Sequence, residues 1–158
     1  FIIHARKGIL KGLSPRQNRN IPPLNSQKVY SIKDDFPELE IIINGGIKNI
    51  SELKKHLNFV DGVMLGRAAY DDPFMLSDID SEIYSNTKIE ISRKDLLTEY
   101  LDYVHVMTKK GYDPKIMLKH VFGLKKGEKD AKRFRVKVAE IMNSSSLVEN
   151  KDELLSMV

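Results

Sequence analysis

The sequence lacks cysteine altogether and contains no long apolar run. Without cysteine, these residues can form no disulfide, no thiolate zinc site and no cysteine nucleophile. A membrane span would need about 18 consecutive apolar residues, and a secretory signal would need a basic segment ahead of an apolar one; neither pattern occurs. The hydrophobic content of 41% is enough for a packed core, so we expect a globular, soluble protein. The lack of cysteine is compatible with a reducing compartment but does not establish one.

Acidic residues are scarce between residues 109 and 137, a segment with eleven lysines and arginines but only three acidic residues. This segment carries a net charge of +8 in a chain whose total is +4, so the rest of the chain is net acidic. Such an asymmetry suggests a polyanionic partner for the basic part. Its densest part, residues 132–137, alternates basic and apolar side chains, and an ordinary solvated helix face is the alternative.

The first half alternates between two kinds of pattern. Three short apolar runs, at residues 1–4, 40–44 and 62–65, predict parallel strands buried on both faces. Apolar residues spaced by three and four predict helices over residues 26–36 and 49–57, the second with Asn49 as its N-cap. Strand and helix in alternation predict an α/β fold with βαβ connections.

The second half predicts a small helical bundle. Residues 71–90 are polar and acidic, and we expect a linker there with one helical turn at 73–76. Helices are predicted from residue 92 to 111, from 113 with Pro114 at its first position, over 128–142 and over 149–157. The residues expected in the bundle core are Leu96, Leu97, Tyr100, Tyr103, Val104, Met107, Ile116, Met117, His120, Val121, Phe134, Val138 and Ile141.

The predicted domains follow from this change of pattern. An α/β part covers residues 1–78, a linker covers 79–91 and an all-α part covers 92–158. A closed barrel of parallel strands has eight strands, so about five would have to come from outside this sequence.

Asn44-Gly45-Gly46 directly follows the second predicted strand. Asn-Gly is a strong signal for a hairpin turn, but the residues that follow show a helical pattern instead of a returning strand. At the carboxyl end of a parallel strand, two glycines would expose backbone N–H groups that an anion could approach closely. We therefore favour a ligand-binding turn over a hairpin.

Two further motifs are expected at the same edge of the sheet. The third strand ends in Gly66-Arg67, which alone would indicate a tight turn, but which beside the two glycines suggests a phosphate site. His4 ends the first strand, where a ligand role competes with that of an ordinary core histidine. The connection over residues 5–24 is unusually long for a βα loop, and such loops are often functional.

Four motifs together resemble a known family. They read FIIHARK at residues 1–7, GLSPRQNRNIPPL at 12–24, INGGIK at 43–48 and DGVMLGRAAY at 61–70. In this order they resemble the tRNA-dihydrouridine synthases, specifically their A subfamily, and residues 120–135 also resemble its helical domain. The resemblance implies the last three βα units of a (β/α)8 TIM barrel, followed by a helical tRNA-binding domain.

The resemblance also implies an activity and its residues. Such an enzyme uses FMN, with NADPH as hydride source, to reduce a uridine in the D-loop of tRNA to 5,6-dihydrouridine. Arg16 and Arg19 match residues that position tRNA, and Arg6 is a weaker candidate for approaching the substrate. Six residues match FMN contacts, the last five of them around the phosphate: His4, Asn44, Gly45, Gly46, Gly66 and Arg67.

The family's proton-donating cysteine and flavin-contacting lysine have no counterpart here. We therefore expect the chain to be the carboxyl-terminal part of a longer, monomeric, cytoplasmic enzyme, inactive alone, without a metal or a membrane segment. An organelle stays open as its location, because the sequence begins at Phe1. Two other functions stay open: a non-catalytic basic RNA-binding module derived from the enzyme, and a flavin barrel acting on a small molecule.

Overall fold

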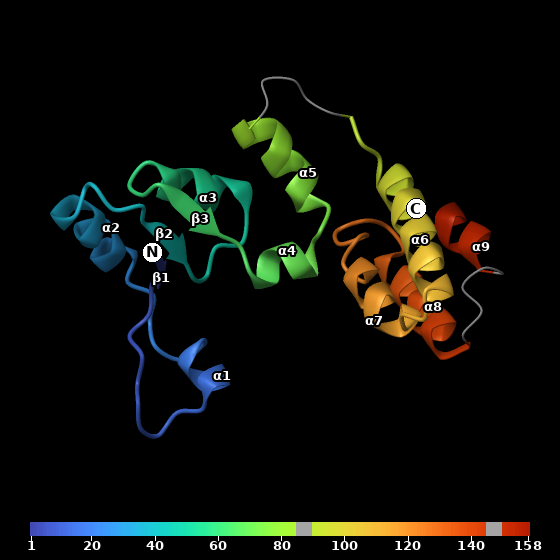
Figure 1. Cartoon of the computed structure of the whole chain (residues 1–158), viewed down its shortest axis with the longest axis horizontal. Coiled ribbons are helices and arrows are strands. Elements are labelled where there is room, and N and C mark those ends of the chain that lie inside the picture. The colour runs from blue at the N-terminus through green and yellow to red at the C-terminus, as the bar shows by residue number, and fades with distance from the viewer. Residues whose placement is uncertain (85–89, 145–149) are drawn as a thin grey trace. The chain divides into compact units, whose positions relative to one another are not determined.

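The computed structural model describes residues 1–84, 90–144 and 150–158. Within them the chain forms two compact units, Phe1–Ala68 and Ala69–Val158, which are described separately (Figure 1). None of the described helices has the length and apolar character that crossing a membrane would require.

The first unit is built on a parallel sheet, as predicted. Its strands β1 (Ile2–His4), β2 (Ile42–Asn44) and β3 (Gly62–Met64) lie in the order β1-β2-β3. The register pairs His4 with Asn44, and Asn44 with Met64, so all three strands end at the same level. Two of the predicted site residues, His4 and Asn44, are therefore neighbours at the carboxyl edge.

The predicted helices between these strands are also present. Helix α2 (Ser26–Asp35) precedes β2, and α3 (Ile50–Leu57) lies between β2 and β3. Asn49 caps α3 as predicted, since its side chain accepts a hydrogen bond from the Glu52 N–H. Both connections between neighbouring strands therefore contain a helix, which is what parallel pairing requires.

The predicted burial of all three strands on both faces is wrong. Ile43 is fully buried, but Ile2 is 61% exposed and Met64 is 42% exposed. Side chains alternate between the two faces of a strand, and no described residues cover the face that holds Ile2 and Met64. Strands β1 and β3 are also the two edges of this sheet.

Asp61 fastens the opposite, amino-terminal edge of the sheet. Its carboxylate accepts a hydrogen bond from the Ile41 N–H at 2.8 Å and pairs with the Lys33 ammonium of α2, also at 2.8 Å. The Ile41 hydrogen bond, with the Lys33 contact next in weight, lowers the pKa of this carboxyl below its ordinary value. This edge is thus held by local contacts, while the carboxyl edge carries the candidate site.

The second unit is helical, as predicted. It includes α6 (Arg93–Lys109), α7 (Pro114–Leu118) with the short 3-10 helix η2 (Lys119–Val121), α8 (Ala131–Ser144) and α9 (Lys151–Ser156). Ser92 and Asp95 form a capping box that starts α6, and Asp113 caps α7 ahead of Pro114. The predicted start of the last helix at Glu149 lies outside the described residues.

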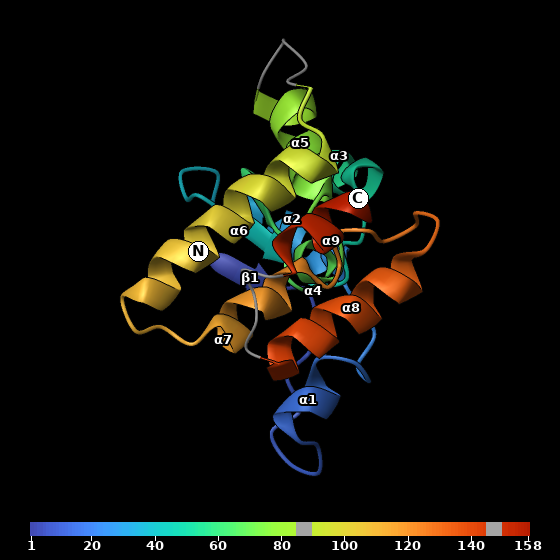
Figure 2. The ribbon, with the colours of Figure 1, turned by 90° about the vertical axis from the view of Figure 1, so that its right-hand side faces the viewer.

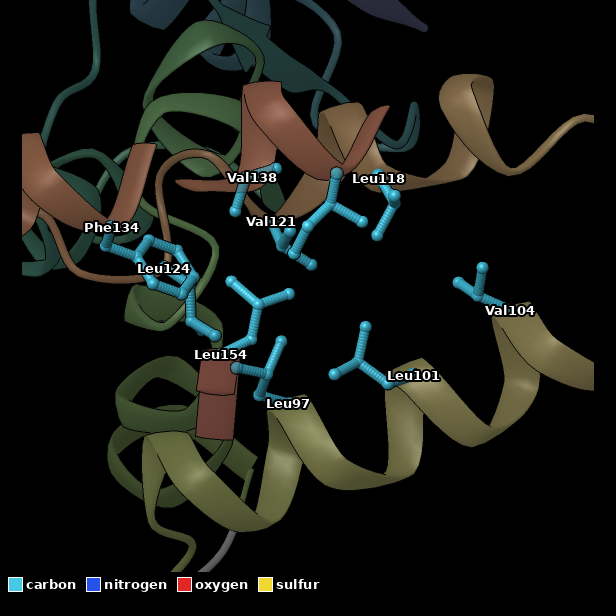
Figure 3. Close-up of a cluster of buried hydrophobic side chains, with 10 residues drawn as sticks. Leu97, Leu101, Val104, Leu118, Val121, Leu124, Phe134, Val138 and Leu154 are labelled. Atoms are coloured by element: carbon cyan, nitrogen blue, oxygen red, sulfur yellow. The ribbon is translucent and has the colours of Figure 1, made fainter. Parts of the chain in front are cut away.

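A single apolar cluster holds these helices together. Phe134, Val138 and Ile141 of α8 are buried as predicted, but Tyr103 is 51% exposed and Ile116 is 61% exposed, so their predicted burial is wrong. His120 is also exposed. Figure 3 shows the side chains that meet in the cluster, labelled as Leu97, Leu101, Val104, Leu118, Val121, Leu124, Phe134, Val138 and Leu154.

The predicted linker is wrong over much of its length. Helix α4 (Arg67–Asp71) runs into it, and α5 (Met75–Ile79) and a π-helical segment, η1 (Asp80–Tyr84), follow. Figure 2, turned by 90°, shows α5 as a regular helix. Residues 85–89 of the expected linker lie outside the described part of the chain.

The segment that follows α4 packs on the bundle instead of spanning a gap. The guanidinium of Arg93 lies 4.0 Å from the centre of the Phe74 ring, and the rings of Tyr70 and His120 meet edge to face at 5.6 Å. A Cβ on Gly123 would lie 2.4 Å from the Asp71 carbonyl oxygen, so only glycine allows this approach. These contacts explain why the division between the units falls at Ala68.

Candidate functional site

The candidate site lies at the carboxyl edge of the sheet, where the turn after β2 passes β1. Gly45 and Gly46 have φ angles of +119° and +77°, a region that favours glycine. A Cβ on Gly45 would lie 3.3 Å from His4 Cε1, and one on Gly46 would lie 2.3 Å from Leu24 Cδ1. The turn therefore passes so close to His4 and Leu24 that a side chain at either glycine would force one of these neighbours to shift.

The same turn carries free backbone donors. Within the described residues, the N–H groups of Gly45 and Gly46 donate no hydrogen bond to another protein group. The chain continues into α3 and the parallel strand β3, so the hairpin alternative is wrong. Amide donors left open at the end of a parallel strand can receive an anion.

Gly66 and Arg67 follow β3 at the next position along the edge. A Cβ on Gly66 would meet nothing within 4 Å, so the backbone here faces open space. The exposed Arg67 donates from Nη1 to the side-chain oxygen of Asn20 at 2.8 Å. It forms no ion pair with any described acidic residue, so its positive charge is available to an anion.

His4 lies among positive charges. Partial burial lowers the pKa of its imidazole below the ordinary value of 6.5, and the charges of Arg6, Arg67 and Arg19 lower it further, in that order. These three arginines, which are far apart in the sequence, are thus close enough to act on one ring. The carboxyl edge is electropositive, which suits a phosphate group.

Arg6 is directed toward the long loop. Its Nη1 donates to the carbonyl oxygen of Pro22 and, more weakly, to that of Asn20 at 3.4 Å. Its Nε is buried and has no partner among the described residues. The guanidinium therefore fastens the loop to the sheet, and its Nε–H is a buried donor without a partner in the described structure.

The long loop is ordered by its own side chains. It contains a short helix, α1 (Pro15–Asn18), started by a capping box between Ser14 and Gln17. The Asn18 side chain accepts from the Ile9 N–H at 2.8 Å and donates to the Ile9 carbonyl at 2.9 Å, which closes the loop on itself.

The two candidate RNA-contacting arginines differ in position. Both Arg16 and Arg19 are exposed, and neither forms an ion pair with a described residue. Arg19 is near enough to His4 to affect its pKa, whereas Arg16 has no such effect. The loop thus presents one positive charge at the site and another farther out along α1.

The residues present fit a phosphate-bearing cofactor. Two open amide N–H groups, the unpaired cation of Arg67 and the orphaned Nε–H of Arg6 are all donors, and no described acidic side chain opposes them at His4. Leu24, which packs on both glycines, and Asn20, which binds Arg67, were missed by sequence reasoning. Only the GLSPRQNRNIPPL motif pointed to their neighbourhood.

The part of the chain that the structure describes holds no cluster of histidine and carboxylate side chains suited to a metal ion. The site is instead a set of hydrogen-bond donors at the carboxyl ends of parallel strands. That placement defines the class: an α/β protein with a cluster of hydrogen-bond donors at the carboxyl edge of its parallel sheet.

The chain belongs to the dihydrouridine synthase (Dus) family, whose sequence profile matches residues 1–157. This is a family of TIM-barrel flavoproteins that act in tRNA processing as oxidoreductases. The predicted family is thus confirmed.

Individual relatives agree with this assignment. The chain is 43% identical over 140 residues to the tRNA-dihydrouridine(20/20a) synthase of Haemophilus ducreyi. It is 42% identical over 135 residues to the enzymes of that name from Pseudomonas putida and Synechocystis sp.. These matches cover 85–89% of this chain but only 40–43% of the relatives' length.

Proposed function

We propose that this chain forms the cofactor-phosphate and tRNA-docking part of an FMN-dependent tRNA-dihydrouridine synthase. In this proposal it contributes the last three βα units of the barrel and the helical domain that follows. NADPH supplies the hydride, and the product is 5,6-dihydrouridine in the D-loop. Since the relatives are named for positions 20 and 20a, we assign those uridines to this enzyme as well.

One observation carries the proposal. Gly45 and Gly46 leave their backbone N–H groups without a partner in the described structure, at a strand end that Arg67 and Arg19 make electropositive. Open amides in a positively charged corner bind phosphate well, because hydrogen bonds to a charged acceptor are worth about 1.5–3 kcal/mol each. We assign His4, Asn44, Gly45, Gly46, Gly66 and Arg67 to FMN.

In this proposal the glycine amides, Arg67 and His4 have different roles. The glycine amides and the Arg67 guanidinium hold the phosphate and so fix the position of the cofactor. His4, whose pKa is lowered by partial burial and then by the charges of Arg6, Arg67 and Arg19, would offer a ring nitrogen to the flavin. The bound flavin supplies hydride transfer to the uracil ring, and the cysteine that gives the proton is not among these residues.

The remaining assignments concern the RNA. Arg16 and Arg19 project from the ordered loop and contact the phosphates of tRNA, and the helical unit adds its basic surface. The enzyme acts as a monomer in the cytoplasm. A non-catalytic RNA-binding module would use the same arginines but would need no phosphate cradle after β2.

The test uses the full-length protein that contains this chain. Purified with flavin and given NADPH and unmodified tRNA, it should form dihydrouridine at positions 20 and 20a, detected by mass spectrometry. No dihydrouridine, despite bound tRNA, would support the RNA-binding module instead. Substituting Arg16 and Arg19 by alanine should weaken tRNA binding; unchanged affinity would favour a flavin enzyme that acts on a small molecule.

A further inference from the structure

Asn20 connects the long loop to the arginine that follows β3. Its side-chain oxygen Oδ1 accepts the hydrogen bond from Arg67 Nη1 at 2.8 Å, and its Nδ2 donates to the Arg16 carbonyl at 3.1 Å. Its backbone N–H donates to the Gln17 carbonyl at 3.0 Å. One side-chain amide therefore bonds on one side to the loop and on the other to the site.

The orientation of this amide follows from its partners. The Arg67 guanidinium can only donate, and the Arg16 carbonyl can only accept. The Asn20 oxygen must therefore face Arg67, while its NH2 group faces the Arg16 carbonyl. The reversed amide would place donor against donor at Arg67 and acceptor against acceptor at the Arg16 carbonyl, and would lose both bonds.

We propose that Asn20 is a positioning residue that aims the Arg67 guanidinium at the cofactor phosphate and couples cofactor binding to the placement of the loop. The inference rests on the proposed function, because it requires a phosphate at Arg67. A guanidinium has five N–H donors in a rigid plane, so the one Nη1 hydrogen that Asn20 occupies leaves a free edge for a bidentate contact.

Apart from Asn20, no described group holds the Arg67 side chain in a fixed orientation. No described carboxylate pairs with it, and the side chain is exposed, so Asn20 is its only hydrogen-bond partner in the described structure. Without Asn20, a long and flexible side chain would have to be ordered at the moment of phosphate binding. The expected result is weaker binding of a phosphate-bearing ligand.

The contact also makes the two ligands interdependent. A phosphate that fixes Arg67 also fixes the amide of Asn20, and through it the turn that carries Arg16. If FMN raises the affinity for tRNA by some factor, linkage requires that tRNA raise the affinity for FMN by the same factor. Riboflavin, which has no phosphate, should not produce this effect.

Asn18 offers a matched control in the same loop. Its side chain closes the loop through the backbone of Ile9 and makes no contact with Arg67. Asn18→Ala therefore loosens the loop and leaves the partner of Arg67 in place. A purely structural role of Asn20 would make the two variants behave alike.

The experiment measures FMN and riboflavin affinities of the full-length apoprotein by flavin fluorescence. Asn20→Ala should weaken FMN binding about three- to tenfold and leave riboflavin binding unchanged. This is less than the roughly 13-fold or larger effect of a direct hydrogen bond to a charged group, because Asn20 acts on the phosphate only through Arg67. Asn18→Ala should not alter the ratio of the two affinities. In an Arg67→Ala background, Asn20→Ala should have no additional effect.

The second part of the experiment measures the tRNA affinity of the same proteins with and without FMN. FMN should raise tRNA affinity in the wild type and in Asn18→Ala, but this increase should disappear in Asn20→Ala. Asn20→Asp gives a second variant: its carboxylate pairs with Arg67 and competes with the phosphate, so FMN affinity falls while riboflavin affinity, which also reports correct folding, is kept.

Two results would overturn the inference. Equal losses for FMN and riboflavin in Asn20→Ala, or a full additional loss in the Arg67→Ala background, would show that Asn20 acts without Arg67. The proposed function would survive either result, provided that the wild type binds FMN and forms dihydrouridine. A wild type that binds neither flavin would instead refute both.

Discussion

The hydroxyl oxygen of Tyr30 lies 2.6 Å from Nδ1 of His56 and joins α2 to α3. Phe59 stacks on the Tyr30 ring with the two ring centres 4.4 Å apart. Burial lowers the pKa of His56 below 6.5, against a smaller opposing effect of Glu52. Burial also raises the pKa of Tyr30, so this pair is held as a neutral imidazole and a neutral phenol.

We predict that acid destabilises the first unit through this pair. Because the folded pKa of His56 lies below the unfolded one, the unfolded chain binds more protons once the pH falls below about 6.5. The free energy of unfolding should therefore be constant at higher pH and fall as the pH drops through the folded pKa. His4, whose pKa is lowered too, acts in the same direction.

The measurement is urea unfolding at about pH 7.5 and about pH 5.5 for the wild type, His56→Gln and His4→Gln. Each substitution should reduce the difference in unfolding free energy between the two pH values. A difference that His56→Gln leaves intact would contradict the assignment.

Binding of FMN should raise the pKa of His4 in an NMR titration, because a phosphate offsets the nearby cations.

We predict that Gly46→Ala destabilises the protein and weakens flavin binding. A φ of +77° costs an alanine about 1–2 kcal/mol, and its Cβ would press on Leu24. Gly12→Ala is the matched control, because Gly12 has a φ of +88° but nothing within 4 Å of its Cβ. The difference between the two variants in urea unfolding isolates the Leu24 contact, and Leu24→Ala should remove it.

We predict a larger loss for Gly123→Ala in the second unit. The added Cβ would lie 2.4 Å from the backbone oxygen of Asp71, which cannot move as a side-chain end can. The segment after α4 would have to leave the bundle, at a cost of about 2–4 kcal/mol for such overpacking. Gly127→Ala, with φ +81° and open space, should cost only the backbone term of about 1–2 kcal/mol by thermal or urea unfolding.

We predict that the basic face of α8 contributes to tRNA affinity in a salt-dependent manner. Lys132, Arg133 and Arg135 are exposed and form no ion pair with described residues. Replacing one of them by alanine should lower the slope of log affinity against log salt by about 0.7–0.9 if it neutralises one phosphate. Binding titrations at several salt concentrations measure this slope.

Lys137 provides the control for that series. Its ammonium pairs with Glu153 at 2.6 Å and with Glu140 at 3.8 Å, so it is engaged within the bundle. Lys137→Ala should leave the salt slope unchanged. Equal slopes for all four variants and the wild type would mean that α8 presents an ordinary solvated face.

Much of the architecture was readable from residue patterns. The βαβ order, the parallel pairing, the Asn49 cap and the burial of Phe134 follow from local rules: periodicity, capping chemistry and the short range of helix contacts. The family assignment also followed from four short motifs. These features depend mainly on residues that are close in the sequence, so one sequence is enough to predict them.

The errors have a common origin in long-range contacts. Polar residues after Tyr70 suggested a linker, but the Asp71 carbonyl meets Gly123 and Phe74 meets Arg93, which anchors the segment on the bundle. Helical periodicity alone could not tell that Tyr103 faces solvent while Leu101 is buried. Which side of a helix is covered depends on where its partners dock, and that is not a local property.

The helices and strands, their order and the glycines of the open turn after β2 can all be recognised from residue patterns. Which side chains gather around that turn depends instead on contacts between distant parts of the chain. Asn20, Arg67 and His4 are distant in sequence. They come to the same edge of the sheet because the parallel register places the strand ends at one level and the long loop folds back toward that edge. A hydrogen bond such as the one from Arg67 to Asn20 exists only once the fold has brought its partners within 3 Å of each other.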